Sequence, residues 1–205
     1  MMEFFTQSFD YISRGGPIMV PIVICSFVAL TLVIERWIAL REVKLFPMEL
    51  LNELRNLSQE KKIAQVQSLA KTNSSPIARI LAASVAENKD KKIVEEQMNL
   101  YGREQALGLE KNLEMLGVLA TIGPLLGLLG TVTGMIQTFD VIKVVGVGDP
   151  LKLSGGIAEA LLNTAGGLMV GIPAFVFQRW YYRKVEKYVL KMEQYVLEIF
   201  LLLYG

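Results

Sequence analysis

Three stretches without a charged residue alternate with polar segments along the chain. They cover residues 18–34, 115–139 and 160–178. About 20 apolar residues cross a hydrocarbon core as an α-helix, and a slightly shorter stretch is extended by flanking aromatic and snorkelling side chains. The pattern therefore predicts three transmembrane helices, at residues 17–40, 113–139 and 157–178.

The polar segments between these stretches also show helical periodicity. Residues 41–112 carry apolar stripes at helical spacing, with breaks expected at Pro47, residues 72–76 and residues 88–90. Apolar residues in 179–205 recur at the same spacing, which predicts either a separate amphipathic helix or an extension of the third span. Residues 140–156 are expected to form a short connecting loop.

The first residues of the chain have their own pattern. Phe4, Phe5, Phe9 and Ile12 recur at helical spacing among polar residues, and two glycines and a proline follow. An amphipathic helix of this kind lies on a membrane surface, so residues 1–16 are predicted to be interfacial. The fold class that follows is all-α: a polytopic membrane protein with three transmembrane helices, long helices extending into the cytoplasm and an N-terminal interfacial amphipathic helix.

The distribution of cations predicts the orientation. Lysine and arginine cluster after the first and third spans, whereas few lie before the first span or in residues 140–156. Cytoplasmic flanks carry the excess of these residues. We therefore expect a periplasmic N-terminus, a cytoplasmic segment 41–112, a periplasmic loop 140–156 and a cytoplasmic C-terminus.

Composition narrows the possible chemistry. The 205 residues are 52% hydrophobic with a mean hydropathy of +0.40, and the net charge of +1 gives no indication of a nucleic-acid partner. The chain contains no histidine and one cysteine, Cys25, which lies within an apolar stretch. Histidine-dependent catalysis, imidazole metal sites and an intrachain disulfide are thereby excluded. No cofactor, metal or enzymatic activity is predicted.

Glycines at a spacing of four predict close packing between the second and third spans. Small residues at this spacing allow two membrane helices to approach closely. The predicted packing residues are three glycine pairs and two prolines within the spans: Gly123, Gly127, Gly130, Gly134, Gly167, Gly171, Pro124 and Pro173.

Polar side chains within these spans are the candidate site. They are Thr131, Glu159, Asn163 and Thr164. An ionisable residue within a span is costly and marks function by default. Two structural explanations stay open: Glu159 could lie in headgroup water at the outer end of the third span, and each threonine could bond a carbonyl of its own helix.

One carboxylate and several hydroxyls suit the passage of a proton or small cation better than that of a bulky solute. Glu159 and Asn163 lie four residues apart and share a helix face. Three spans without an internal repeat are few for an autonomous transporter. The sequence thus predicts a pore subunit that works as an oligomer or with a partner.

Two segments, IGPLLGLLGTVTGMIQTF (122–139) and IAEALLNTAGGLMVGIPA (157–174), closely resemble the signatures of the ExbB/TolQ/MotA proton-channel family. Three spans rather than four are similar to its ExbB/TolQ branch. This resemblance implies a homo-oligomer, a pentamer, around the helices of an ExbD- or TolR-like dimer in a bacterial inner membrane. The partner would carry the titrating aspartate, and proton flow would drive a TonB- or TolA-like transducer.

Position by position, the resemblance gives Thr131 and Thr164 the family's lumen positions and Glu159 its third-span glutamate. Pro124 and Pro173 match its span prolines. Two positions depart from the family. Asn163 stands where relatives often have Thr or Ala, and Gly166 stands where they often have Ala. An added amide in the lumen leaves open a proton or Na⁺ as the ion, and we expect a proton.

Other functions also remain possible. A passive membrane scaffold would use the glycines and threonines only for packing, and a related stator could serve another motility or envelope system. An intramembrane enzyme is disfavoured because no pair of nucleophile and base is visible.

Overall fold

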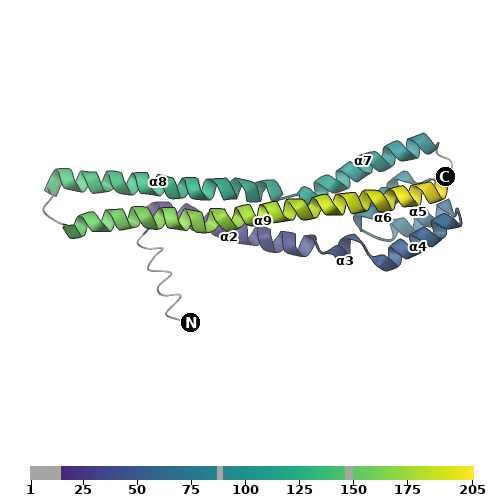
Figure 1. Ribbon diagram of the computed structural model, residues 1–205, viewed down its shortest axis with the longest axis horizontal. Helices are drawn as coiled ribbons and strands as arrows, with labels where there is room; N and C mark the ends of the chain where they lie inside the picture. Colours follow the sequence, from purple (N-terminus) through teal and green to yellow (C-terminus); the bar gives the residue numbers. More distant parts are fainter. Residues whose placement is uncertain (1–14, 87–89, 146–149) are drawn as a thin grey trace. The chain divides into compact units, whose positions relative to one another are not determined.

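A computed structural model describes residues 15–86, 90–145 and 150–205, and all regular structure in these ranges is helical (Figure 1). The prediction of an all-α protein is therefore confirmed. Three of the helical stretches are long and apolar enough to cross a membrane. Residues 1–14 of the predicted interfacial helix lie outside the described residues. The helices are α2 (Gly16–Ala39), α3 (Glu42–Leu45), α4 (Met48–Gln59), α5 (Ile63–Lys71), α6 (Pro76–Ser84), α7 (Lys91–Glu110), α8 (Leu113–Val145) and α9 (Pro150–Tyr204).

Helices α8 and α9 both reach into the segment predicted as the outer loop. Helix α8 continues to Val145 past an ion pair of 3.3 Å between Asp140 and Lys143, and Pro150 opens α9 at a position where a missing backbone N–H is tolerated. Beyond the third predicted span, α9 continues without interruption to Tyr204. Of the two possibilities for residues 179–205, the structure shows a helical extension of that span.

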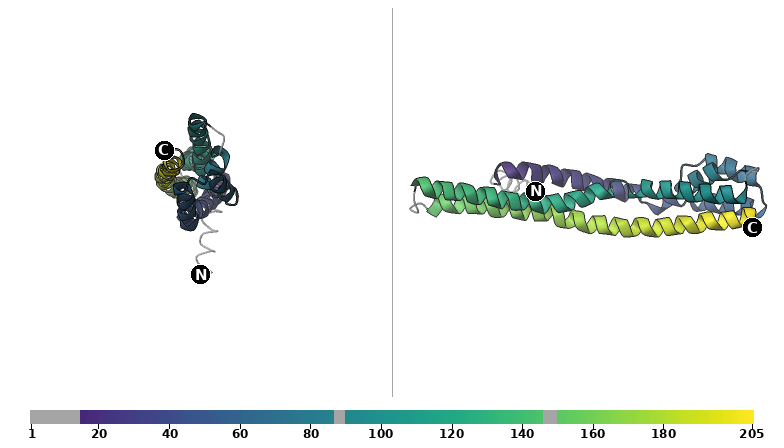
Figure 2. Two further views of the ribbon diagram at one scale, coloured as in Figure 1. Left: turned by 90° about the vertical axis from the view of Figure 1, so that its right-hand side faces the viewer. Right: turned by 90° about the horizontal axis from the view of Figure 1, so that it is seen from above.

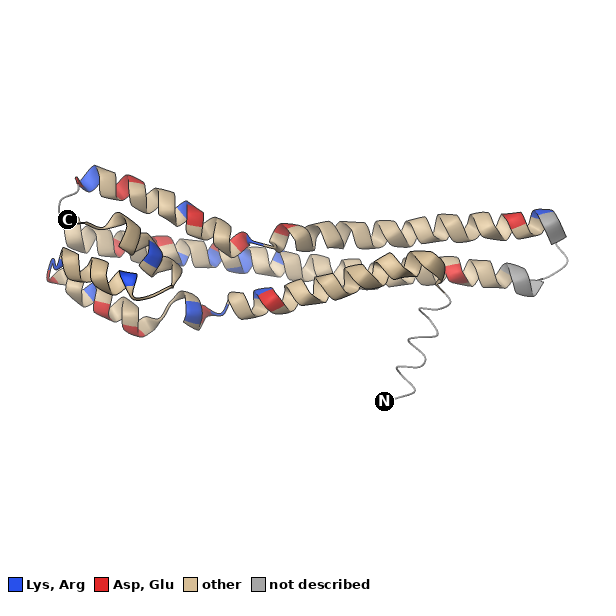
Figure 3. Cartoon of the chain, turned by 180° about the vertical axis from the view of Figure 1, so that it is seen from behind, with Lys and Arg blue, Asp and Glu red and all other residues tan. Residues whose placement is uncertain are grey.

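The chain divides into two compact units. The first unit consists of α2 as far as Ile34 and of residues Asn112–Arg179, which hold α8 and the beginning of α9. Between Glu114 and Asp140, α8 carries no charged side chain (Figure 3). Large apolar side chains project from the unit, and Phe27 and Met169 are 68% and 77% exposed. Such a surface suits a hydrocarbon environment rather than water.

The second unit consists of Glu35–Lys111 and Trp180–Gly205 and has its own apolar core. Its fully buried members include Leu40, Leu54, Val66, Ile77, Leu81, Val94, Tyr181 and Met192. The backbone carbonyl of Leu40 accepts a hydrogen bond of 3.3 Å from the Tyr188 hydroxyl, which ties the end of α2 to α9. At the surface, Arg55 of α4 pairs with Glu198 of α9 at 2.7 Å, and this carboxylate raises the pKa of the Arg55 guanidinium.

One buried charge in the second unit is fully accounted for by polar contacts. Arg36 is 5% exposed, and its guanidinium pairs with the neighbouring Glu35 and donates to the Leu109 carbonyl at 3.3 Å. A buried cation needs such compensation because desolvation is expensive. Arg36 thereby fixes the last turns of α2 to the end of α7.

The boundary between α7 and α8 is a backbone turn. Asn112 has a φ of 65°, in the left-handed region, and α8 begins at the next residue. Asparagine tolerates this conformation better than most residues with a Cβ. The charged segment and the apolar span are therefore separate helices.

Candidate functional site: the contact between α8 and α9

Helices α8 and α9 lie side by side and antiparallel within the first unit (Figures 1 and 2). A Cβ built on Gly134 would lie 3.0 Å from the Cβ of Ala160, whereas one on Gly123 would lie 3.1 Å from the carbonyl oxygen of Gly167. Residue numbers thus rise along one helix as they fall along the other. We call the small-residue contact between these helices the seam. Its members are Gly117, Gly123, Gly127, Gly130 and Gly134 of α8 and Gly156, Ala160, Asn163, Thr164, Gly167, Gly171 and Gln178 of α9.

Close approach within the seam requires glycine on both helices. A Cβ on Gly167 would lie 2.5 Å from the carbonyl oxygen of Gly123 and 3.0 Å from the Cα of Gly127. On Gly171 it would lie 2.5 Å from the ring of Pro124. Contacts this short against backbone and a rigid ring leave no room for a side chain. The glycines predicted to pack helices thus lie where the two backbones come closest, and Pro173 is exposed.

Thr164 joins the two helices through a hydrogen bond. Its hydroxyl donates to the backbone carbonyl of Gly127 at 3.2 Å, from a half-buried position. That carbonyl can accept this bond because its oxygen has two lone pairs, and the absence of a side chain on Gly127 lets Thr164 come within reach. A polar contact of this kind between membrane helices contributes about 0.6 kcal/mol. The Thr164 side chain is therefore held by its own helix, α9, and by its hydrogen bond to α8.

Asn163 is the most deeply buried polar side chain of the seam. It is 1% exposed, and its Cβ, Cγ and Nδ2 occupy the space in which a side chain at Gly130 would lie. Its Oδ1 has no hydrogen-bond partner within the described part of the chain. Leaving a buried acceptor unpaired costs about 1–3 kcal/mol. An orphaned amide oxygen in an apolar span is a feature that packing alone does not explain.

The threonines of α8 use their hydroxyls locally. Thr131 donates to the Leu128 carbonyl at 2.6 Å, and Thr133 donates to the carbonyls of Leu129 and Gly130 at 3.1 Å each. This is the backbone bonding that the sequence left open as an explanation. No hydrogen bond joins Thr131 to Thr164 within the described ranges. The structure therefore brings Asn163 and Thr164 together at the seam and leaves Thr131 half-buried on α8.

Glu159 contacts a helix that the sequence did not connect to it. A Cβ on Gly16 would come within 1.9 Å of the Glu159 Oε1, so the carboxylate lies against the first residue of α2. A helix N-terminus carries a partial positive charge and unpaired N–H groups, which favour a carboxylate beside it. Gly16 has a φ of 65°. Both its conformation and the nearby carboxylate thus call for glycine at this position.

Removal of the Glu159 charge should loosen the start of α2. Glu159→Gln keeps the shape of the side chain but removes an interaction worth about 0.3–1 kcal/mol. Amide hydrogen exchange at Val20 and Ile22, the first amides of α2 with carbonyl acceptors inside the helix, should rise by up to about fivefold. The matched control is Glu114→Gln, which removes an exposed carboxylate from the first turn of α8. Unchanged exchange at Val20 and Ile22 in Glu159→Gln would refute the anchoring role.

Several seam contacts were not predicted from the sequence. The amide of Gln178 fills the space over Gly117, and the Thr138 hydroxyl lies over Gly156 while donating to the Gly134 carbonyl at 2.9 Å. The signal that could have revealed them is the continuation of small residues at intervals of three or four, through Gly156 and Ala160. Gly166 faces Met19 and Ile22 of α2 at ordinary contact distance.

Comparison with known proteins gives a consistent set of similarities. The profile of the MotA/TolQ/ExbB proton channel family matches residues 72–194. The putative biopolymer transport protein ExbB-like 3 of Synechocystis is 32% identical over 168 residues, which cover 80% of this chain and 79% of the relative. The ExbB-like 1 protein of the same organism is 27% identical over 183 residues, or 86% and 72% of the two chains. The Tol-Pal system protein TolQ of Haemophilus influenzae is 36% identical over 77 residues, or 38% and 34%.

Proposed function

Because this chain belongs to the MotA/TolQ/ExbB proton channel family, we propose that it is a stator subunit that couples proton entry to mechanical work. The family is defined by a proton channel and not by an enzymatic activity, in agreement with the predicted absence of catalysis. The three helices of this chain that are long and apolar enough to span a membrane make it a multi-pass membrane protein. The finer proposal is an ExbB- or TolQ-like subunit in a bacterial inner membrane, with a periplasmic N-terminus and a cytoplasmic C-terminus.

The observation that best supports this function is the polar pair inside the glycine seam. Among the described residues, Asn163 keeps an unpaired acceptor in a buried position, and Thr164 donates its hydroxyl to the backbone carbonyl of Gly127. A hydroxyl that both donates and accepts can pass a proton by exchanging its hydrogen bond for one to water. A scaffold built only for packing would gain more from apolar residues at both positions.

We propose that several copies, five by resemblance, surround the single-span helices of an ExbD- or TolR-like dimer. Thr131, Glu159, Asn163 and Thr164 would border the lumen, and the partner would supply the titrating carboxylate. The work would be delivered to a TonB- or TolA-like transducer. The passive scaffold remains the second candidate, since Thr131 and Thr133 bond their own helix.

Proton flux in vesicles tests the proposal directly. The purified chain should conduct no protons alone, and flux should appear when it is co-reconstituted with its ExbD- or TolR-like partner under an imposed pH gradient. Replacing the partner's span aspartate by asparagine should abolish that flux. A sodium gradient imposed without a pH gradient distinguishes Na⁺ from protons. Equal leakage with and without the partner would favour the scaffold.

A further inference from the structure

The second unit has an apolar ridge on one face of α7. Ile93, Leu100 and Leu107 are spaced by seven residues and are 48%, 64% and 68% exposed. At about 100° per residue, a spacing of seven places all three along one line of the helix. Exposed charges flank the line, among them Lys92, Glu104 and Lys111. The described residues of the chain leave this stripe largely uncovered, and a stripe of this kind is typical of a helix face that packs against another helix.

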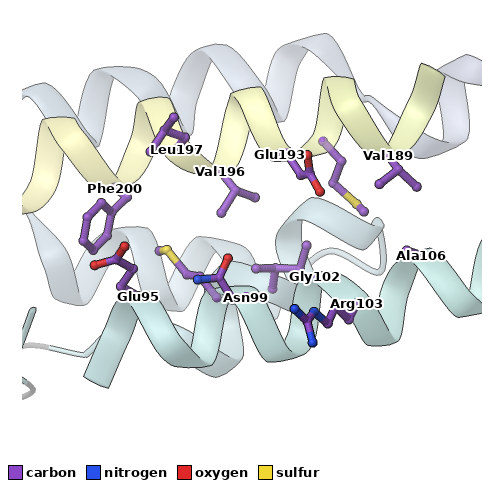
Figure 4. A pocket seen from close by; sticks show the side chains of 13 residues that line it. Glu95, Asn99, Gly102, Arg103, Ala106, Val189, Glu193, Val196, Leu197 and Phe200 are labelled. Atoms are coloured by element: carbon purple, nitrogen blue, oxygen red, sulfur yellow. The ribbon is translucent and has the colours of Figure 1, made fainter. Parts of the chain in front are cut away.

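A groove lies on a different face of the same unit. It has a volume of about 530 Å³ and runs between α7 and the last part of α9 (Figure 4). Its floor is formed by the buried Met98, Met192, Val196 and Phe200. Its exposed rim carries Glu95, Arg103 and Glu193 together with Leu197, which is 57% exposed. Methionine-rich floors adapt to the shape of an apolar partner.

Gly102 gives the groove its depth. It lies in the middle of α7, where glycine weakens a helix relative to alanine, and a Cβ added there would meet nothing within 4 Å. No packing within the described chain therefore requires glycine at this position. A partner that approaches the helix backbone closely would require it.

We infer that the ridge of one copy occupies the groove of the next. On α7 the groove-lining positions lie roughly a third of a turn away from the ridge, so a chain cannot fill its own groove. Membrane insertion gives every copy the same orientation relative to the bilayer. Under that restriction a contact between two different faces repeats around an axis and closes into a ring. The inference rests on the proposed homo-oligomer and names a contact that would hold it together outside the apolar spans.

The charges at the two surfaces are compatible with this pairing. Lys92 beside the ridge can meet the carboxylate of Glu95 at the rim, and Glu104 can meet Arg103, since the members of each pair lie at nearly the same height along α7. Such rim charges fix the register of an interface more than they add to its affinity. A second copy therefore offers both the apolar filling and the complementary rim.

Disulfide cross-linking of the full chain in its membrane tests the contact. In a Cys25→Ser background, Leu100→Cys on the ridge is combined with Leu197→Cys at the groove. Mild oxidation should give a ladder extending beyond dimers, whereas each single cysteine variant should remain monomeric. The control pair combines Leu100→Cys with Val43→Cys, at a side chain that is 83% exposed and belongs to neither surface. Absence of the ladder, an equal ladder in the control pair, or dimers of a single variant would overturn the inference.

Charge insertion provides the second measurement. Leu107→Glu should reduce the Leu100–Leu197 cross-link at least severalfold, and Val43→Glu should leave it unchanged. Cross-linking of the ridge to a different protein instead of a second copy would also overturn the proposal. Partner-dependent proton flux in the same membranes separates the two ideas. Flux without the cross-link refutes only the ridge-and-groove contact, and the cross-link without flux refutes only the channel function.

Discussion

Replacement of Thr164 by valine is expected to abolish partner-dependent proton flux while the protein still assembles. Valine keeps the shape of the side chain but removes the hydroxyl that donates to the Gly127 carbonyl. Loss of this interhelical hydrogen bond should cost only about 0.6 kcal/mol of stability. A relay that loses this exchangeable hydroxyl should slow by at least about tenfold, which corresponds to about 1.4 kcal/mol in the barrier. Flux into vesicles, normalised to the amount of assembled complex, is the measurement.

Two further threonines make this test specific. Thr131→Ala should also abolish flux if Thr131 borders the lumen as proposed. Thr121→Val is the matched control, because Thr121 is exposed and donates to the Gly117 carbonyl one turn back. Wild-type flux in both Thr164→Val and Thr131→Ala would remove the hydroxyl relay from the mechanism and leave the scaffold as the better account.

Replacement of Gly167 by leucine is expected to disrupt the seam itself. Even the first carbon of the new side chain would lie 2.5 Å from the Gly123 carbonyl oxygen, so the two helices would have to separate. Overpacking of a tight contact costs about 1–3 kcal/mol or more. The apparent melting temperature of the purified protein in detergent should fall by roughly 3–10 °C, and the Thr164–Gly127 hydrogen bond should be lost with it.

Gly155→Leu is the control for this substitution. Gly155 also lies in α9, but a Cβ there would meet nothing within 4 Å. The control protein should melt within about 1 °C of the wild type, as expected for a surface change. Equal melting of Gly167→Leu and Gly155→Leu would show that α8 and α9 do not approach as closely as the glycines indicate.

The sequence by itself determined the fold class and the three apolar spans. Charge is excluded from hydrocarbon so strongly that uninterrupted apolar stretches predict membrane helices without any knowledge of their neighbours. The glycine pairs predicted a close helix contact for a similar reason, since a backbone in a membrane gains by approaching another one. Pro47 and the turn before Pro76 ended helices as predicted, because proline disrupts the helix before it.

Local sequence did not indicate the breaks at Lys61 and Asn112. Both residues have positive φ values, of 55° and 65°, in places without glycine or proline. At Lys61, packing of the flanking helices α4 and α5 on each other outweighs the modest strain of such a backbone. A conformation that tertiary contacts impose in this way leaves no local signal at Lys61, whereas Asn112 is of a residue type that tolerates it.

Only the tertiary structure decided the partners of the polar residues. Helical spacing placed Glu159 and Asn163 on one face, but Glu159 meets Gly16 of α2 and Asn163 meets Gly130 of α8. The same face of α9 contacts both α2 and α8, and which residue contacts which helix depends on how those helices pack. Periodicity fixes the direction of a side chain around its own axis and carries no information about which distant segment lies opposite. The polar groups of the spans could therefore be identified from the sequence, whereas the neighbour of each one depends on how α2, α8 and α9 pack.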